Sequence, residues 1–173
     1  VRPAFSPDGH HLAVTGDRRV VLFELNGPAT RSTLAAQESP GRAFAYCPDG
    51  QTLATVAALD EDWGVVRLWD GVGGDLRGEW DVEAGFGPIT KTSVSFHLAG
   101  NTLAVGSEDG KLHLVDTEKS NVAVHFNSDT AEAFVHDPSG RTIWGVRDER
   151  EIVGWDVQTV EERSAWSNQM AKT

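Results

Sequence analysis

The sequence predicts an all-β protein, a β-propeller of four blades with four antiparallel strands each, and three observations lead to this fold class. A five-residue turn motif that ends in glycine returns four times, and its glycines are separated by 41, 50 and 40 residues. A short apolar segment follows each turn, and a second apolar segment a few residues later ends in Asp or Glu. A repeat near 40 residues with several short strands per unit is typical of propeller blades. The four glycines are Gly9, Gly50, Gly100 and Gly140.

Each repeat is expected to form four strands, a to d, joined by tight turns. Strand a ends at the turn motif, strand b follows it, strand c ends at the acidic residue, and strand d comes after a polar turn. Residues 111–116 illustrate the alternation of a strand, because Leu112 and Leu114 fall on one face. The turns Pro-Asp-Gly and Pro-Ser-Gly suit their place, since Pro presets φ, Asp bonds its own backbone and Gly tolerates positive φ.

The repeat continues into strand d. In the second and fourth repeats this strand ends in a tryptophan, Trp80 and Trp166, and each lies ten residues after the acidic end of strand c. Four blades and a polar tail therefore account for nearly the whole chain. We expect the blades at about residues 1–36, 42–81, 92–127 and 131–167, and the tail at residues 168–173.

The turn motif at residues 5–9 (FSPDG), together with a strand c that ends in Trp-Asp, resembles the repeat of the WD40 family. Four copies cover nearly the whole chain. The resemblance implies that Trp69 and Trp155 pack between blades and bind no ligand. We expect the acidic residues at the end of strand c to accept hydrogen bonds from the turn that follows them. These residues are Asp70, Asp116 and Asp156.

The chain departs from the family pattern before strand a. Many members carry a Gly-His pair there, and no such pair precedes Phe44, Val94 or Phe134. A buried relay of His, Ser or Thr, Asp and Trp that depends on this His is therefore not carried over to the chain. Apolar packing is expected to hold the blades together instead.

Composition limits the partners that the chain is expected to bind. Among its 173 residues are 26 acidic and 15 basic ones, and the net charge of −11 disfavours non-specific nucleic-acid binding, which needs a basic surface. A basic protein partner suits this charge. No apolar run approaches the ~20 residues of a membrane helix. The single cysteine, Cys47, leaves no intramolecular disulfide, and we expect a cytoplasmic protein.

Four blades leave two sheet faces to be covered. In a ring every face packs on a neighbour, and propellers that resemble this one most often close with seven or eight blades. We expect either a two-fold dimer that completes an eight-bladed ring or a segment of a longer propeller, and a closed four-blade ring is the third alternative. An isolated half-ring would expose large apolar patches.

The second repeat is the longest, and its extra residues predict a contact surface. Residues 57–64 between strands b and c, and residues 82–90 between strands d and a, account for the 50-residue period. In propellers of this family both connections lie on one rim, and loops on a rigid scaffold often carry binding residues. An aromatic side chain flanked by carboxylates suits a partner with Lys or Arg, and the alternative is a tolerated surface insertion. The predicted patch is Asp60, Glu61, Asp62, Trp63, Glu83 and Phe86.

The sequence predicts no catalytic residue, no metal site and no cofactor. Three adjacent carboxylates at residues 60–62 point in different directions, whereas Ca²⁺ takes about six to eight oxygens from a suitable loop. The histidines lack metal-ligand spacing, and no nucleophile elbow or phosphate-binding loop is present. These observations favour a non-catalytic scaffold that binds a protein or peptide through its loop rim. The alternative is a propeller hydrolase of the lactonase type, for which His136 is the only titratable candidate on a strand a.

Overall fold

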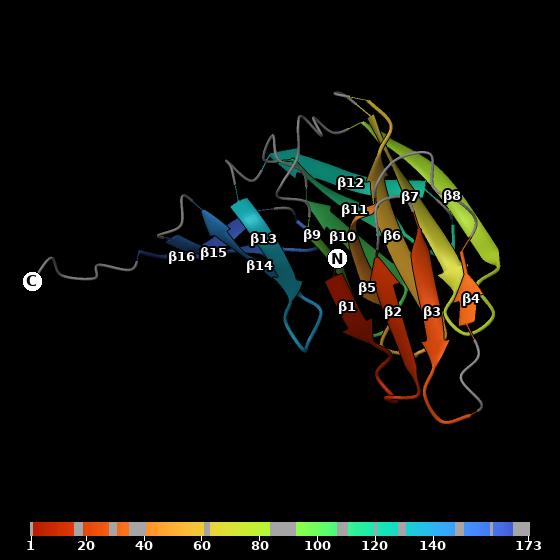
Figure 1. The fold of residues 1–173 in the computed structure, drawn as a ribbon. Coiled ribbons are helices and arrows are strands. Elements are labelled where there is room, and N and C mark those ends of the chain that lie inside the picture. The colour runs from red at the N-terminus through yellow and green to blue at the C-terminus, as the bar shows by residue number, and fades with distance from the viewer. Residues whose placement is uncertain are drawn as a thin grey trace, which may run out of the picture.

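The computed structural model contains four antiparallel sheets of four strands, which confirms the predicted fold class (Figure 1). It describes residues 2–15, 19–27, 31–34, 41–60, 63–83, 93–106, 111–119, 121–127, 131–147, 151–159 and 161–167. Strands pair in chain order within each sheet, so every repeat of the sequence forms one blade.

The blades are numbered in chain order, and each contains the four strands a to d. Blade 1 is β1 (Arg2–Phe5), β2 (His11–Thr15), β3 (Val20–Glu24) and β4 (Arg31–Thr33). Blade 2 is β5 (Gly41–Tyr46), β6 (Thr52–Ala58), β7 (Trp63–Asp70) and β8 (Leu76–Glu83). Blade 3 is β9 (Ser93–Phe96), β10 (Thr102–Gly106), β11 (Lys111–Asp116) and β12 (Asn121–Asn127). Blade 4 is β13 (Ala131–His136), β14 (Thr142–Arg147), β15 (Glu151–Asp156) and β16 (Glu162–Ser167).

The turns between strands a and b have the same geometry in all four blades. Each turn glycine adopts a positive φ, at 71° in Gly9, 70° in Gly50, 78° in Gly100 and 69° in Gly140. Its N–H donates to the carbonyl three residues earlier, with N···O distances of 2.8–2.9 Å. A Cβ would strain this conformation, which explains why glycine returns at this place in the repeat.

Apolar side chains join neighbouring blades in three buried clusters. The first lies between blades 1 and 2 and contains Leu22 and Trp69. The second, between blades 2 and 3, contains twelve buried residues, among them Trp80 and Val115. The third lies between blades 3 and 4 around Trp155. The sheets therefore stack face to face in chain order, and strands β5, β9 and β13 lie beside one another along the inner edges of blades 2 to 4.

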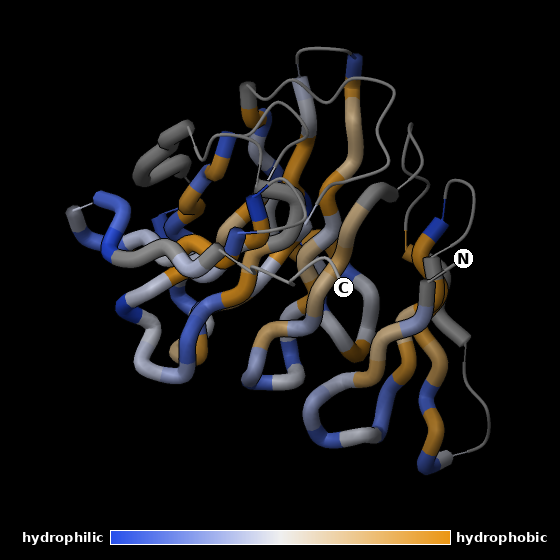
Figure 2. Tube along the Cα trace, turned by 90° about the vertical axis from the view of Figure 1, so that its left-hand side faces the viewer, coloured by the Kyte–Doolittle hydropathy of each residue, from blue (hydrophilic) through white to orange (hydrophobic). Residues whose placement is uncertain are grey.

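Hydropathy follows this stacking. Figure 2 shows apolar residues along the strands and mostly polar or intermediate residues at the turns between them. Both faces of blades 2 and 3 are packed, because each of these blades has a neighbour on either side.

The two outer faces of the stack are exposed. On blade 1 the side chain of Phe5 is 64% exposed, whereas Phe96, at the equivalent place in blade 3, is 8% exposed. On blade 4 the exposed fractions are 57% for Val135, 49% for Ile152 and 56% for Trp166. Such exposure is not expected of a closed four-blade ring, in which these faces would cover each other.

Candidate functional site

The long hairpin of blade 2 carries the predicted contact patch. The sequence predicts a loop for residues 57–64, but half of them extend the sheet, because β6 runs to Ala58 and β7 begins at Trp63. The ladder continues through the register pair of Ala58 and Gly64. Pairing between the two strands therefore lengthens this hairpin beyond those of the other blades.

The tip of this hairpin is held by hydrogen bonds between Asp60 and Trp63. The Trp63 N–H donates to Oδ1 of Asp60 at 2.7 Å. The N–H groups of Leu59 and Asp60 donate to the Trp63 carbonyl at 2.8 and 3.2 Å. The indole of Trp63 and the side chain of Leu59 nevertheless face solvent, with exposed fractions of 43% and 44%. A backbone fixed at both ends of the tip therefore presents two exposed apolar side chains next to a carboxylate.

The structure brings three of the six predicted patch residues to one end of blade 2. Asp60 and Trp63 lie at the hairpin tip, and the register of β7 and β8 places Glu83 directly opposite Trp63. Glu61, Asp62 and Phe86 lie outside the described residues.

The tryptophans at the end of strand c are buried between blades. Trp69 is 2% exposed and packs against blade 1, and its Nε1–H donates to Oγ1 of Thr55 at 2.9 Å. Trp155 is 3% exposed and packs against blade 3, with its rings 5.8 Å from the Phe134 ring. Both side chains are part of the core and are inaccessible to a ligand.

The aspartates that follow these positions close the turns between strands c and d. Oδ1 of Asp70 accepts the N–H groups of Val72 and Gly73, at 3.0 and 2.7 Å. Oδ1 of Asp116 and Oδ1 of Asp156 each accept the same pair of N–H groups, two and three residues later. The pKa of each aspartate lies below its ordinary value. At Asp116 the side-chain bond from Lys119 contributes most, and at Asp70 and Asp156 the backbone bonds that stabilise the carboxylate contribute most. A lowered pKa and a structural hydrogen bond suit a turn and do not suit a general acid.

Two histidines and a serine meet where blades 3 and 4 adjoin. The Nδ1 of His136 lies 3.3 Å from Oγ of Ser95, and the rings of His136 and His97 are 5.7 Å apart, edge to face. Burial, reinforced by the nearby His97, lowers the pKa of His136 to about 4, so the ring is neutral near pH 7. Nε2 of His136 is buried without a hydrogen-bond partner among the described residues. A Ser-His pair without an acidic residue bonded to the imidazole lacks the orienting group of a hydrolase triad.

Cys47 and the histidines offer no metal site in the described part of the chain. Cys47 is 2% exposed, and burial raises the pKa of its thiol to about 11, which keeps it protonated. No group of three or more His, Cys, Asp or Glu side chains among the described residues is placed to hold a metal ion. The same part of the chain contains no helix with the length and apolar character that a membrane span requires.

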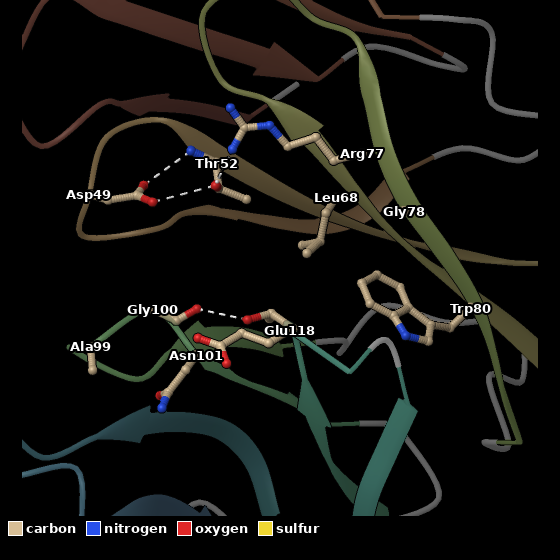
Figure 3. A pocket seen from close by; sticks show the side chains of 11 residues that line it. Asp49, Thr52, Leu68, Arg77, Gly78, Trp80, Ala99, Gly100, Asn101 and Glu118 are labelled. Carbon is tan, nitrogen blue, oxygen red and sulfur yellow. Dashed lines mark hydrogen bonds between the residues drawn. The ribbon is translucent and has the colours of Figure 1, made fainter.

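A cleft on the opposite rim was not predicted. It lies between blades 2 and 3, encloses about 300 Å³, and has Leu68 and Trp80 among its apolar lining residues (Figure 3). Its polar lining includes Asp49 and Arg77 of blade 2 and Asn101 and Glu118 of blade 3. These residues come from separate repeats, so no contiguous motif marks them. The signal that marks them is a change of charge at equivalent turn positions when the four repeats are aligned.

A stack of four-stranded antiparallel sheets, joined by strand-c residues that pack on the preceding sheet, defines a segment of a β-propeller. The family described as the Anaphase-promoting complex subunit 4 WD40 domain matches residues 44–158. The match spans more than half of the chain, which therefore belongs to the WD40-repeat family.

A yeast protein gives a more distant comparison. The COMPASS component SWD3 of Saccharomyces cerevisiae is 28% identical to this chain over 113 residues. The aligned region is 65% of this chain and 33% of SWD3. The chain thus spans about a third of the length of this relative.

Proposed function

We propose that the chain is a non-catalytic WD40 scaffold that binds a protein or peptide through the loop rim of blade 2. The observation that carries this proposal is the exposed Trp63 at the tip of the longest hairpin, 43% exposed beside Asp60. Large aromatic side chains on a rigid backbone are frequent anchors of protein interfaces. SWD3, a component of a protein assembly by its name, supports the same class of function.

A partner rich in Lys or Arg fits this rim. The chain carries a net charge of −11, which attracts cations and repels nucleic acid. A basic side chain gains both a carboxylate and an aromatic face when it docks beside Trp63. Binding at this rim needs no cofactor.

The test is a selection of peptides from a random library on the chain, followed by affinity measurements with fluorescently labelled hits. Trp63→Ser and the double charge reversal Glu61→Lys with Asp62→Lys are each expected to weaken binding at least tenfold. Asp60 is left unchanged because it closes the hairpin turn. Glu161→Lys, at an exposed turn of blade 4, is the matched control and is expected to bind as the parent does. Hits without an excess of Lys and Arg, or unchanged affinity in both variants, would contradict the proposal.

We also propose that a second copy of the chain covers the exposed outer faces, so that two half-rings form an eight-bladed ring. The face of blade 4 with Val135, Ile152 and Trp166 has the same place in the repeat as the face of blade 2 that packs on blade 3. The outer face of blade 1 carries Phe5. Its equivalent in blade 3 is the face that packs against blade 2. The two exposed faces are therefore the two halves of an interface that the chain already forms three times.

Light scattering over a range of concentrations tests this assembly. A two-fold dimer is expected, and Trp166→Glu should shift it to the monomer because the charge would be buried in the interface. A monomer at every concentration, or a dimer that Trp166→Glu leaves intact, would contradict the eight-bladed ring.

A further inference from the structure

We propose that the cleft between blades 2 and 3 binds the basic side chain of a peptide, with the charged head between Asp49 and Glu118 and the aliphatic stem along Leu68 and Trp80. This site lies on the rim of the a–b and c–d turns, opposite the rim that carries Trp63. The proposal rests on the scaffold role proposed above in one respect, because it assumes that the chain binds peptides. It adds a second contact and names the chemistry that this contact recognises.

The cleft has the size of one side chain. Its volume of about 300 Å³ is at the lower end of the range for ligand pockets. Figure 3 shows Leu68 pointing into the gap and Trp80 at one end of it, with Asp49 on the blade 2 side and Glu118 on the blade 3 side. An apolar floor between two acidic walls matches a Lys or Arg side chain, whose stem is apolar and whose head is charged.

Gly78 keeps the space open. A Cβ at this position would lie 3.5 Å from the nearest atom of the Trp80 ring, an ordinary contact, so a larger residue is compatible with the strand. In blade 3 the residue equivalent to Gly78 is Val124. The strand register shows this, because Leu68 pairs with Gly78 and the equivalent Leu114 pairs with Val124. The cleft thus depends on a glycine that another blade replaces with valine.

Among the described residues, acidic side chains outnumber basic ones at the cleft, although Arg77 belongs to its lining and Lys119 lies close to Glu118. The acids are Asp49 and Glu118 in the lining, with Asp70 and Asp116 beside them. Asp49 accepts hydrogen bonds from Gln51 and Thr52 of its own turn, and the Cys47 thiol also interacts with its carboxylate. The cations nearest to Asp49 and Glu118 have other partners. The guanidinium of Arg77 donates to Asp70 at 2.5 Å and to Thr52 at 2.9 Å, and Lys119 pairs with Asp116 at 2.9 Å.

The pair of acids occurs in one of the repeated clefts, because the cleft between blades 1 and 2 has Asp8 at the place of Asp49 but Val72 at the place of Glu118. In the cleft between blades 3 and 4, the positions equivalent to Asp49, Asn101 and Glu118 carry Ala99, Arg141 and Gln158. Glu118 and Gln158 even make the same bond, since each donates its backbone N–H to Oδ1 of the aspartate two residues earlier. The fold therefore needs no acid at this turn position, and the side-chain charge of Glu118 has no part in closing the turn.

A cation between the two walls gains two Coulomb partners that lie on different blades, and the indole of Trp80 adds an aromatic surface for the stem. Both carboxylates are exposed, which limits the affinity that the site gains from charge. We expect saturable binding of a single basic side chain in the millimolar range, and tighter binding when a longer peptide also engages the opposite rim.

The experiment is an NMR titration of the ¹⁵N-labelled chain with the tripeptides acetyl-Gly-Lys-Gly-amide and acetyl-Gly-Arg-Gly-amide. The expected result is saturable shifts of the Trp80 indole N–H and of the Gly78 and Asn101 amides. The norleucine tripeptide, which has the stem without the charge, is expected to leave these signals unchanged. Glu118→Gln should weaken binding at least fivefold and Gly78→Val should abolish it, whereas Glu161→Gln removes an exposed acid elsewhere and should change nothing.

Several results would overturn the proposal: shifts that do not saturate, shifts of equal size with the norleucine peptide, or undiminished binding in Glu118→Gln. Glu118→Gln keeps this test valid even where Gly78→Val disturbs folding, because glutamine already occupies the equivalent turn of blade 4. The double reversal of Glu61 and Asp62 separates the two proposals. It is expected to weaken binding at the hairpin rim at least tenfold and to leave the tripeptide titration unchanged.

Discussion

Trp80 and Trp166 occupy the same place in two repeats and have opposite surroundings. Each lies in strand d, paired with the third residue before the strand-c tryptophan. Trp80 is 8% exposed because blade 3 covers it, whereas Trp166 is 56% exposed and stacks on Trp144 of its own blade, with ring centroids 4.9 Å apart. The same residue type thus occurs at equivalent positions of two repeats. Whether it contributes to the packing between blades depends on the presence of a neighbouring blade.

The largest effect on stability is expected at Trp80, the buried member of this pair. Trp80→Ala removes a side chain packed between two blades and is expected to lower the free energy of unfolding by about 3–5 kcal/mol. Urea denaturation followed by circular dichroism measures this change. A loss below about 1 kcal/mol would mean that the contact between blades 2 and 3 does not hold them together.

Acid should weaken the interface between blades 3 and 4. Burial lowers the pKa of His136 from its ordinary 6.5 to about 4, so the unfolded chain takes up this proton first as the pH falls. The free energy of unfolding is expected to fall between about pH 6.5 and pH 4, by an amount on the order of 1–3 kcal/mol. His136→Phe, which copies the equivalent Phe96 of blade 3, serves as the comparison. Equal slopes for both proteins in this pH range would contradict the prediction.

A smaller effect on stability is expected at Trp166, the exposed member of the pair. In a dilute solution of the chain, Trp166→Ala loses mainly the stacking on Trp144, and the expected cost is about 0.5–1.5 kcal/mol. The same urea titration at low protein concentration gives the value. A cost as large as that of Trp80→Ala under these conditions would show that another surface covers Trp166.

The smallest effect is expected at the rim turns, which are held locally. Lys119→Ala removes an exposed ion pair with Asp116 and leaves the backbone bonds of that aspartate intact. The change in the free energy of unfolding should stay below about 0.5 kcal/mol. A larger loss, measured as the shift of the urea midpoint, would mean that the rim contributes to the contact between blades.

The blades follow from the sequence because their signals are local. Turn glycines need a positive φ, and strand c ends in an acid that closes the next turn, so the residues of each repeat are enough to predict its own strands. The extension of β6 to Ala58 was not apparent. Two alanines carry little strand preference of their own, and pairing with β7 decides their conformation.

The sites are harder to predict because they combine separate repeats. Asp60 and Trp63 are close in sequence, so their place at one hairpin tip follows from the strand pattern. Asp49 and Glu118 belong to different blades and approach each other only through the stacking of two sheets. A linear motif cannot show that contact, and neither can it show that Trp166 lacks a cover.

The three apolar clusters have a consequence for how the chain opens. Within the described residues, each apolar cluster joins two adjacent blades, so local unfolding is expected to spread by nearest-neighbour coupling, as in a linear array. The cluster of twelve residues between blades 2 and 3 is the largest, and backbone amides of β6, β7 and β10 should exchange most slowly with solvent deuterium. Amides of β1 and β16, at the two ends of the stack, should exchange first. A defect in an end blade then lowers protection in the adjacent blade and leaves the far half of the chain almost unchanged.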